Sequence, residues 1–509
     1  MTTMLAIRSP ESPSVHDRRQ TLKSIALAPL VGLAGLSVGT SAAQGGPSGA
    51  GVGTSLGGAD AQRDLRILQR AFTALYPGLY RYATPEQIAA AFEQAQAAVS
   101  QGCSRAELYL QASRLAAEVC CGHTWASAYN QRQDLVEHLF ARADKLPLTL
   151  RWVEDRALVT GSAADGLSAG SELLAIDGRP VADIRDALLP LLRADGRHAG
   201  ARLKRLSQLD SGPNGGAMDR LFPLRFAPRE GRYTLTVRER GNAGIRTPVV
   251  AATTTAARDM LLPPPRTDWS LRIDGDTGLL TLPTFAFWRS DFKPEPFLRQ
   301  AFAALAGVPF LIIDQRSNEG GDDAIGRLLL SHLLRAPLQL PGYRVESAYE
   351  RVPYALARYL DTWDFGFFDR TGQVSKGAGR NWLLPDSAGT RTEPVVAPYA
   401  GRTVVLVGPQ NSSAGFLFAR DVQRSGAATL LGQSTGGNLR GLNGGQIAWI
   451  NLPASGVGVD IPLLASMAPG DPPDAGVVPE VQVPPRWSDA VAGIDTEMVA
   501  ARALVAGWR

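Results

Sequence analysis

The chain has 509 residues, enough for two or three domains that each bury a core. Its composition is that of a soluble globular protein, with 45% hydrophobic, 20% charged and 7% aromatic residues. The formal net charge is only +4, part of that excess lies in residues 1–43, and no basic block occurs. The sequence therefore argues against a nucleic-acid partner.

Residues 17–43 have the pattern of an export signal. Arg18 and Arg19 precede a moderately apolar run that contains Gly and Ala and closes on Ser41–Ala43, a small-x-small cleavage pattern. A short membrane anchor is the alternative, but the run is brief and glycine-rich, and no other stretch reaches about 18 uninterrupted apolar residues. We expect a twin-arginine signal peptide, a periplasmic or secreted mature protein, and no stable membrane insertion after cleavage.

Cysteine usage is compatible with export but does not require it. Cys103, Cys120 and Cys121 allow at most one intramolecular disulfide. Adjacent cysteines rarely bridge each other, so a bond from Cys103 to one of the other two and buried free thiols both stay open. No cysteine and histidine spacing typical of a metal site occurs, and the sequence implies no cofactor.

The N-terminal part of the chain predicts a linker and then helices. Residues 44–60 are mostly Gly, Ser and Ala, which is typical of a flexible linker. Residues 61–143 carry apolar positions at i, i+3 and i+4 spacing, with Pro85 and Ser104 near helix starts. We expect a small helical domain there.

Residues 146–255 are dominated by short strands. Residues 148–161 predict a hairpin, and residues 166–192 predict a glycine-bounded turn, a buried strand, an Asp-Gly turn and an amphipathic helix. This order resembles a PDZ domain, a module that adds a peptide as an extra strand. Any other small β-rich insert is the alternative.

Residues 268–509 alternate buried strands with helices. Residues 308–316 and 401–409 are the clearest buried strands, and residues 340–400 form a loop-rich, aromatic excursion. This alternation favours a partly parallel sheet flanked by helices. The fold class we expect is multidomain, α/β and α+β, with a helical N-terminal domain, a PDZ-like β-rich domain and an α/β catalytic core.

Ser413 directly follows the second of these strands and begins an apolar, small-residue helix. Such a strand–turn–helix holds a side chain at the edge of the sheet, where unpaired N–H groups of the helix can bind an oxyanion. Ser413 is therefore the candidate nucleophile, with the Ala414 N–H as a candidate oxyanion donor. A helix cap without chemistry is the alternative.

Further segments could complete such a site. Gly320 and Gly321 follow a predicted parallel strand, where backbone N–H groups can approach a ligand closely; a tight turn is the alternative. Residues 431–441 form another glycine loop, with the same ambiguity. Among five histidines, His123 alone lies in a helix-terminating turn of small residues, which makes it the candidate base. A structural histidine is the alternative.

Together these segments resemble the C-terminal-processing, or tail-specific, serine peptidase family over residues 65–505. The matches are Asp-x-Arg-x-Asn-x-Gly-Gly at 314–321, Ser-Ala-small at 413–415, Gly-x-x-Thr-x-Gly at 432–437, and Gly-Val-x-Pro-acid at 476–480. The resemblance implies a crotonase-like ββα catalytic core, assigned here to residues 268–509, and a serine-type peptidase activity.

The same resemblance distinguishes two branches of the family. In one, a lysine after Thr-x-Gly is the base, but Asn438 stands there and Lys376 is the last lysine of the chain. The tricorn-like branch, which also holds the interphotoreceptor retinoid-binding protein repeats, has Thr-Gly-Gly in this loop and takes its base from an N-terminal histidine. Thr435–Gly437 and Gly122–Thr124 fit that branch, which implies His123 as the base.

The implied reaction is acyl transfer to Ser413, with His123 as base and then acid. The Ala414 N–H and that of Gly320 or Gly321 would form the oxyanion hole. The group that orients His123 stays open, with Thr435, Asp460 and Glu480 as candidates. We expect peptides or unfolded proteins as substrates. A catalytically silent protein binding peptides or hydrophobic ligands and a Ser-His esterase are the alternatives, and no oligomeric state is predicted.

Overall fold

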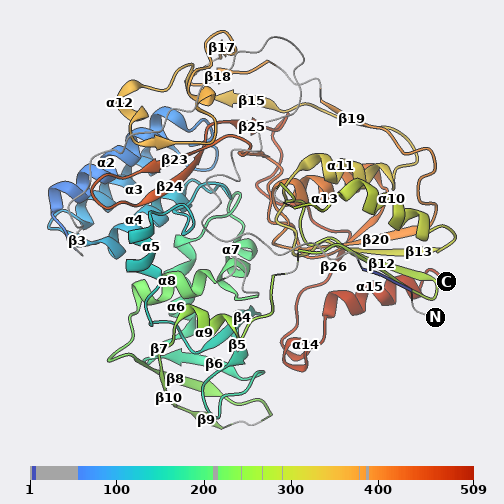
Figure 1. Cartoon of the computed structure of the whole chain (residues 1–509), viewed down its shortest axis with the longest axis horizontal. Coiled ribbons are helices and arrows are strands. Elements are labelled where there is room, and N and C mark those ends of the chain that lie inside the picture. The colour runs from blue at the N-terminus through green and yellow to red at the C-terminus, as the bar shows by residue number, and fades with distance from the viewer. Residues whose placement is uncertain are drawn as a thin grey trace.

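The computed structural model describes residues 55–209, 216–241, 244–265, 267–288, 290–377, 379–385 and 389–509, and the backbone of residues 3–6. The expected export signal at 17–43 lies outside the described residues. Within them, no helix is both long and apolar enough to span a bilayer. Figure 1 shows two lobes, one around the N-terminal helices and one around a largely parallel sheet with helices on both faces.

The sheet of the second lobe, called the main sheet below, has the order β1-β11-β12-β13-β20-β21-β26. Its strands are β1 Thr3–Ala6, β11 Ser270–Asp274, β12 Thr277–Thr281, β13 Phe310–Asp314, β20 Arg402–Val407, β21 Thr429–Gly432 and β26 Val481–Gln482. From β12 onward the neighbours in this order run parallel, whereas β1, β11 and β12 are antiparallel. The carboxyl ends of β13 and β20 therefore meet at one edge, where Asp314 pairs with Leu406.

Both faces of the main sheet are covered, as buried parallel strands require. Leu311 and Ile313 share a core with the helices α10 Pro294–Ala304, α11 Asp323–Ser331 and α13 Ser413–Ser425. Phe310 and Ile312 point to the other face, where α15 Thr496–Ala506 packs (Figure 1). The short α14 Trp487–Ala492 precedes α15. The alternation along β13 follows from the two-residue period of a strand, and the expected α/β core is confirmed.

The expected N-terminal helices are confirmed as α2 Gly58–Leu75, α3 Pro85–Ala98, α4 Arg105–Glu118 and α5 Gln133–Phe140. Capping boxes start α3 at Thr84 and α4 at Ser104. Structure begins earlier than the predicted end of the linker at residue 60, since β2 Ser55–Leu56 pairs with β3 Cys103–Ser104. Leu56 is buried there, which accounts for the difference.

The β-rich region forms a sheet of order β10-β8-β6-β5-β4, with β7 beside β6 and β9 beside β8. Its strands are β4 Leu148–Val153, β5 Arg156–Ser162, β6 Glu172–Ile176, β7 Arg179–Pro180, β8 Arg232–Arg238, β9 Ile245–Arg246 and β10 Val249–Ala251. The accompanying helices are α6 Val181–Leu188, η3 Leu189–Leu191, α7 Ala199–Leu206, α8 Ala217–Arg225 and α9 Thr255–Asp259. The hairpin predicted at 148–161 is confirmed as β4 and β5. The PDZ-like assignment stays a prediction.

The segment 340–400 is more ordered than the loop-rich excursion predicted from sequence. It and its flanks hold β14 Leu338–Leu340, β15 Arg344–Ser347, α12 Tyr354–Ala357, β16 Leu360–Asp361, η4 Phe365–Phe368, β17 Ser375–Lys376, β18 Trp382–Leu383 and β19 Thr390–Thr392. Some of these strands pair with one another, while β15 pairs with β25 Ala465–Met467 and β16 pairs with β23 Ile447–Asn451. β25 pairs in turn with β22 Gly441–Leu442, and β23 with β24 Gly458–Pro462. Each strand is too short to be recognised alone, and pairing with a distant segment is what orders it.

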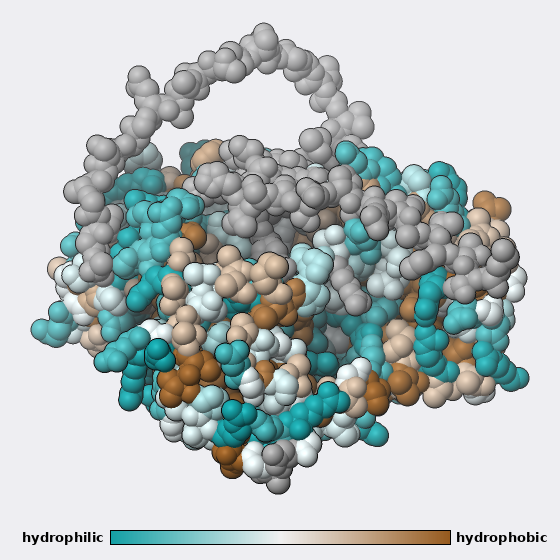
Figure 2. Space-filling model, turned by 60° about the horizontal axis from the view of Figure 1, so that its bottom comes forward, coloured by the Kyte–Doolittle hydropathy of each residue, from teal (hydrophilic) through white to brown (hydrophobic). Residues whose placement is uncertain are grey.

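The packing of this segment joins distant parts of the chain. Trp363 and Phe367 are buried beside Trp449, in the same core as Phe72 of α2. The first lobe is therefore built from the N-terminal helices, the β-rich region and parts of the region after residue 268. The predicted catalytic domain of 268–509 consequently contributes to both lobes. On the face seen in Figure 2, hydrophilic and hydrophobic side chains are interspersed.

Candidate active site

Ser413 is the first residue of α13, after the turn that connects β20 to this helix, and its backbone has a φ of +49°. A serine in this left-handed region stores about 1–3 kcal/mol of strain, which surrounding contacts must hold in place. The side chain is half-buried. The position predicted from sequence is confirmed: Ser413 lies at the carboxyl edge of the main sheet and at the start of a helix.

The loop after β13 packs directly against this turn. A Cβ on Gly320 would lie 2.8 Å from the Ser413 Cβ and 2.9 Å from the Ala414 nitrogen, closer than real side chains approach. Gly320 also has a φ of +106°. Glycine is therefore required here, because only a residue without a Cβ lets the two loops come this close.

Backbone N–H groups around Ser413 differ in their availability. The Gly320 N–H donates to Asn318 Oδ1 at 2.8 Å. The N–H groups of Ala414 and Gly321 donate to no acceptor among the described residues. Of the predicted oxyanion donors, Ala414 and Gly321 are thus free to bind a ligand, whereas Gly320 already has an acceptor.

Two asparagines hold the loops together. Asn411 Nδ2 donates to the carbonyls of Gln315 at 2.5 Å and Asn318 at 3.1 Å. Asn318 Nδ2 donates to the Leu282 carbonyl at 3.1 Å. Both asparagines are fully buried, so these amides replace the water that the loop carbonyls would otherwise bind.

His123 lies in the turn that follows α4, and a segment of the β-rich region flanks this turn. The Gly122 N–H donates to Asp195 Oδ1 at 2.7 Å, and Arg193 Nη1 donates to the Gly122 carbonyl at 2.7 Å. A Cβ on Gly122 would lie 2.8 Å from Asp195 Oδ2. The glycine before the histidine therefore lets the Asp195 carboxylate approach the turn.

The imidazole of His123 has no hydrogen-bond partner for its buried Nδ1. It belongs to a group of three side chains in the described structure that could hold a metal ion. A His123 nitrogen, Cys121 Sγ and an Asp195 oxygen lie within 4.8 Å of one another. Burial lowers the pKa of His123; Asp195 acts to raise it, and Arg193 and Arg205 act to lower it further. The imidazole is therefore neutral at neutral pH, as a general base must be.

No hydrogen bond joins His123 to Ser413 among the described residues. Arg205 and Glu319 form a chain of contacts from the His123 side to Ser412. Arg205 acts on the His123 pKa and lies 3.5 Å from Glu319 Oε1. The Glu319 carbonyl in turn accepts from Ser412 Oγ at 3.0 Å. Long or missing catalytic hydrogen bonds are common without substrate, so this geometry is compatible with a Ser-His pair.

The residues considered for orienting His123 have other partners. Thr435 Oγ1 accepts from the Val477 N–H at 2.8 Å, and Glu480 accepts from Gln423 and from the Leu430 N–H toward the opposite end of α13. Asp460 accepts from Asn130 Nδ2 at 2.9 Å, and its N–H donates to the Trp125 carbonyl at 2.9 Å. Both Asp195 and Asp460 act to raise the His123 pKa, and Asp195 has the larger effect, which makes it the stronger candidate for the role.

Asp195 was not among the site residues predicted from sequence. It lies in a short loop between η3 and α7, outside every motif, and its neighbours on the His123 turn are 72 or more residues earlier. Its burial, at 5% exposure, distinguishes it from surface acids. In the sequence Asp195 stands in a polar run between Arg193 and Arg197, so no pattern marks it without the fold.

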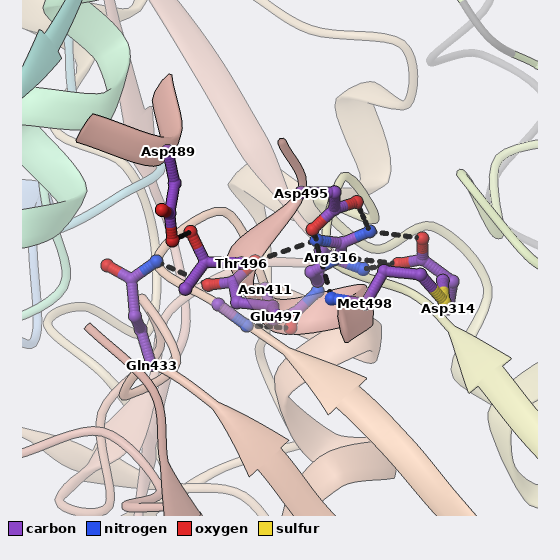
Figure 3. A network of polar contacts seen from close by, with 10 residues as sticks. Asp314, Arg316, Asn411, Gln433, Asp489, Asp495, Thr496, Glu497 and Met498 are labelled. Atoms are coloured by element: carbon purple, nitrogen blue, oxygen red, sulfur yellow. Dashed lines mark hydrogen bonds and ion pairs between the residues drawn. The ribbon is translucent and has the colours of Figure 1, made fainter. Parts of the chain in front are cut away.

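Asp314 and Arg316, matched as part of the glycine-loop motif, fasten α15 to the main sheet (Figure 3). Arg316 pairs with Asp314 Oδ2 at 2.7 Å, Asp495 Oδ1 at 2.7 Å and Glu497 Oε2 at 2.8 Å. Burial acts against its charge, yet hydrogen bonds to Asp314 and Asp495 raise the Arg316 pKa overall. This network anchors the start of the loop that ends at Gly320.

Two cavities of the described structure lie outside the Ser413 turn. One, of about 650 Å³, is lined by Tyr343, Arg440 and Met467 among others. The other, of about 460 Å³, includes Ser317 and Gln410 from the two loops that approach Ser413. Neither is lined by Ser413 or His123.

The comparisons with known proteins agree with this geometry. Residues 276–445, which include the glycine loop and Ser413, match the model of Peptidase family S41. No curated protein sequence matches the chain. Among solved structures, mature CPAF complexed with lactacystin has a TM-score of 0.57 at 16% identity, covering 86% of this chain and 95% of that one. Mature CPAF has a TM-score of 0.54 at 17% identity, covering 85% and 94%. At these identities the structures support the fold.

Proposed function

Because the chain belongs to peptidase family S41 and is a serine-type peptidase, we propose that Ser413 is its nucleophile and His123 its general base. The observation that carries this proposal is the strained backbone of Ser413, held at the edge of the main sheet against Gly320. Strain of this kind at a strand-to-helix turn exposes the hydroxyl of a nucleophile. The Thr435–Gly437 loop and the histidine base together favour the tricorn-like branch.

Peptide hydrolysis then proceeds through an acyl-enzyme. His123 accepts the Ser413 proton as Oγ attacks the peptide carbonyl, and it gives that proton to the leaving amine. Water attacks the ester in a second step, again deprotonated by His123. The free N–H groups of Ala414 and Gly321 bind the oxyanion, each worth about 10²–10³ in rate.

Asp195 is proposed as the residue that positions His123. Its carboxylate receives the Gly122 N–H at 2.7 Å and favours the imidazolium that forms in the transition state. This role is electrostatic and structural, because no hydrogen bond between Asp195 and the imidazole is present among the described residues. Substrate binding would draw the His123 turn and the Ser413 turn together.

Substrates are proposed to be peptides or unfolded proteins that enter as an extended strand. The β-rich region of residues 146–255 would present them, as a PDZ-like module does by adding a strand at a sheet edge. Arg18 and Arg19 and the cleavage pattern at Ser41–Ala43 support export by a twin-arginine route to the periplasm or beyond.

The test is cleavage of unfolded casein by the mature protein, beside Ser413→Ala and His123→Ala. We expect cleavage by the wild type and about 10⁴-fold less by either variant. The absent Ser413–His123 hydrogen bond also fits a protein that binds peptides or hydrophobic ligands without cutting them. A folded wild type that binds but never cleaves peptides would support that reading, and turnover restricted to short esters would indicate an esterase.

A further inference from the structure

Three side chains able to bind a metal ion, one of them the proposed base His123, meet without any assigned role as a group. Cys121 Sγ, a His123 nitrogen and an Asp195 oxygen lie within 4.8 Å of one another. Cys121 is 2% exposed and Asp195 is 5% exposed, while His123 is half-buried and forms the accessible side of the group. They come from the turn after α4 and from the loop between η3 and α7, which hydrogen bonds through Gly122 hold together.

The second observation is an unpaired polar atom on the imidazole that belongs to this group. His123 Nδ1 is buried and has no hydrogen-bond partner. An unpaired polar atom in the interior costs roughly 1–3 kcal/mol, so a ligand that satisfies it gains that amount. The Cys121 thiol is free and keeps no disulfide partner in the described structure. The group therefore offers one sulfur, one nitrogen and one oxygen to an incoming cation.

This donor set selects the metal. Thiolate and imidazole exclude Mg²⁺ and Ca²⁺, which take oxygen ligands, and they suit Zn²⁺ in a tetrahedral site with one open position. Neighbouring ligand atoms on tetrahedral Zn²⁺ are about 3.5 Å apart, from bonds of about 2.0–2.3 Å. Binding would therefore draw the three side chains together by at most about 1 Å.

We propose that Cys121, His123 and Asp195 form an inhibitory Zn²⁺ site. The cation takes the lone pair of one His123 nitrogen, displaces the thiol proton of Cys121 to solvent, and accepts an Asp195 oxygen. The other imidazole nitrogen then carries the remaining proton, so the imidazole has no lone pair left to receive the Ser413 proton. This consequence rests on the proposed role of His123, whereas metal binding itself does not.

Metal binding is tested with Co²⁺ in place of Zn²⁺, on the folded mature protein under reducing conditions. We expect one equivalent to give the visible bands of tetrahedral Co²⁺ and a thiolate charge-transfer band, both removed by adding Zn²⁺. Cys121→Ser should lose the charge-transfer band, and Cys103→Ser, in half-exposed β3, should keep it. Absence of the band from the folded wild type, or its persistence in Cys121→Ser, would overturn the site.

Inhibition is tested by casein cleavage in the presence and absence of Zn²⁺. Saturating Zn²⁺ should lower wild-type cleavage by about 10²-fold or more, the contribution of a general base. Cys121→Ser should resist this inhibition, since it lacks the soft ligand. A wild type that shows the cobalt bands but never cleaves casein would leave the metal site standing and remove the proposed catalysis. A wild type that cleaves casein regardless of Zn²⁺ and shows no cobalt bands would overturn the metal site and leave the proposed catalysis standing.

Discussion

The turns that hold Ser413 and His123 are built in opposite ways. The Ser413 turn is made by backbone: a strained φ, a glycine in contact and asparagines that bind loop carbonyls at the ends of adjacent strands. The His123 turn is held by side chains of a segment distant in sequence: Asp195 accepts from the Gly122 N–H, and Arg193 donates to the Gly122 carbonyl. The first turn is fixed by the main sheet, and the second by packing between distant parts of the chain.

This difference indicates where the proposed enzyme can move. The main sheet is buried on both faces, so the Ser413 turn has little freedom. The His123 turn depends on the first lobe, which several separate segments of the chain assemble. His123 and Ser413, which share no hydrogen bond, therefore belong to a turn of the first lobe and to a turn fixed by the main sheet. Movement of the His123 turn toward Ser413 would complete the site.

The largest effect is expected from the base itself. His123→Ala should lower kcat/KM by about 10⁴-fold, because it removes the proposed acceptor of the Ser413 proton. His198→Ala is the matched control. His198 Nδ1 accepts from the Ala201 N–H at 3.0 Å as the cap of α7, so its loss should cost about 1 kcal/mol of unfolding free energy. Equal losses of kcat/KM in the two variants would contradict a specific role for His123.

The next largest effect is expected at the Ser413 turn, where the backbone contact with Gly320 can be tested. Gly320→Ala forces its new methyl group against Ser413 and Ala414, so kcat/KM should fall about 10²-fold as the oxyanion donors shift. Gly307→Ala is the control, because Gly307 also has a positive φ of +80° but has open space around it. It should cost about 1 kcal/mol of stability with kcat/KM unchanged. A fully active Gly320→Ala enzyme would show that the contact is unimportant.

Asp195→Asn tests the side chains that hold the His123 turn, and it should lower kcat/KM by roughly 10²-fold. This loss is smaller than that caused by replacing a triad carboxylate that is hydrogen-bonded to the catalytic histidine. Its second readout is the pH profile of kcat/KM. Asp195 acts to raise the His123 pKa, so removing its charge should lower that pKa further and move the acid limb to lower pH. Glu480→Gln, at the remote end of α13, should leave the profile unchanged. An unshifted acid limb in Asp195→Asn would rule out its positioning role.

The smallest effect concerns the helix that leads to His123. Ser104→Ala removes the capping box of α4 and should cost about 1 kcal/mol of unfolding free energy, measured by urea titration, with kcat/KM unchanged. Thr84→Ala does the same to α3, farther from His123 in the chain, and should match it. A loss of kcat/KM in Ser104→Ala alone would mean that the His123 turn depends on α4 for its position.

Sequence was informative where function depends on local backbone. The buried strands, the Ser413 turn and the Gly320–Gly321 loop follow from short runs of residues, and each lies where the pattern predicted. The pairing of β15 with β25 and of β16 with β23 could not be predicted, because strands of a few residues acquire order only from distant partners. Asp195 was missed for the same reason. Its contact with the His123 turn exists only after the β-rich region and the N-terminal helices have packed.

Ser413 is proposed to be a nucleophile activated by His123. The most direct measurement is covalent labelling by a fluorophosphonate probe, read by intact mass and peptide mapping. We predict one label on Ser413 in the wild type. Ser412→Ala should be labelled equally, because the Ser412 hydroxyl donates to the Glu319 carbonyl. We expect no label in Ser413→Ala and strongly slowed labelling in His123→Ala. A folded wild type that stays unlabelled, or a label on Ser412, would contradict this proposal.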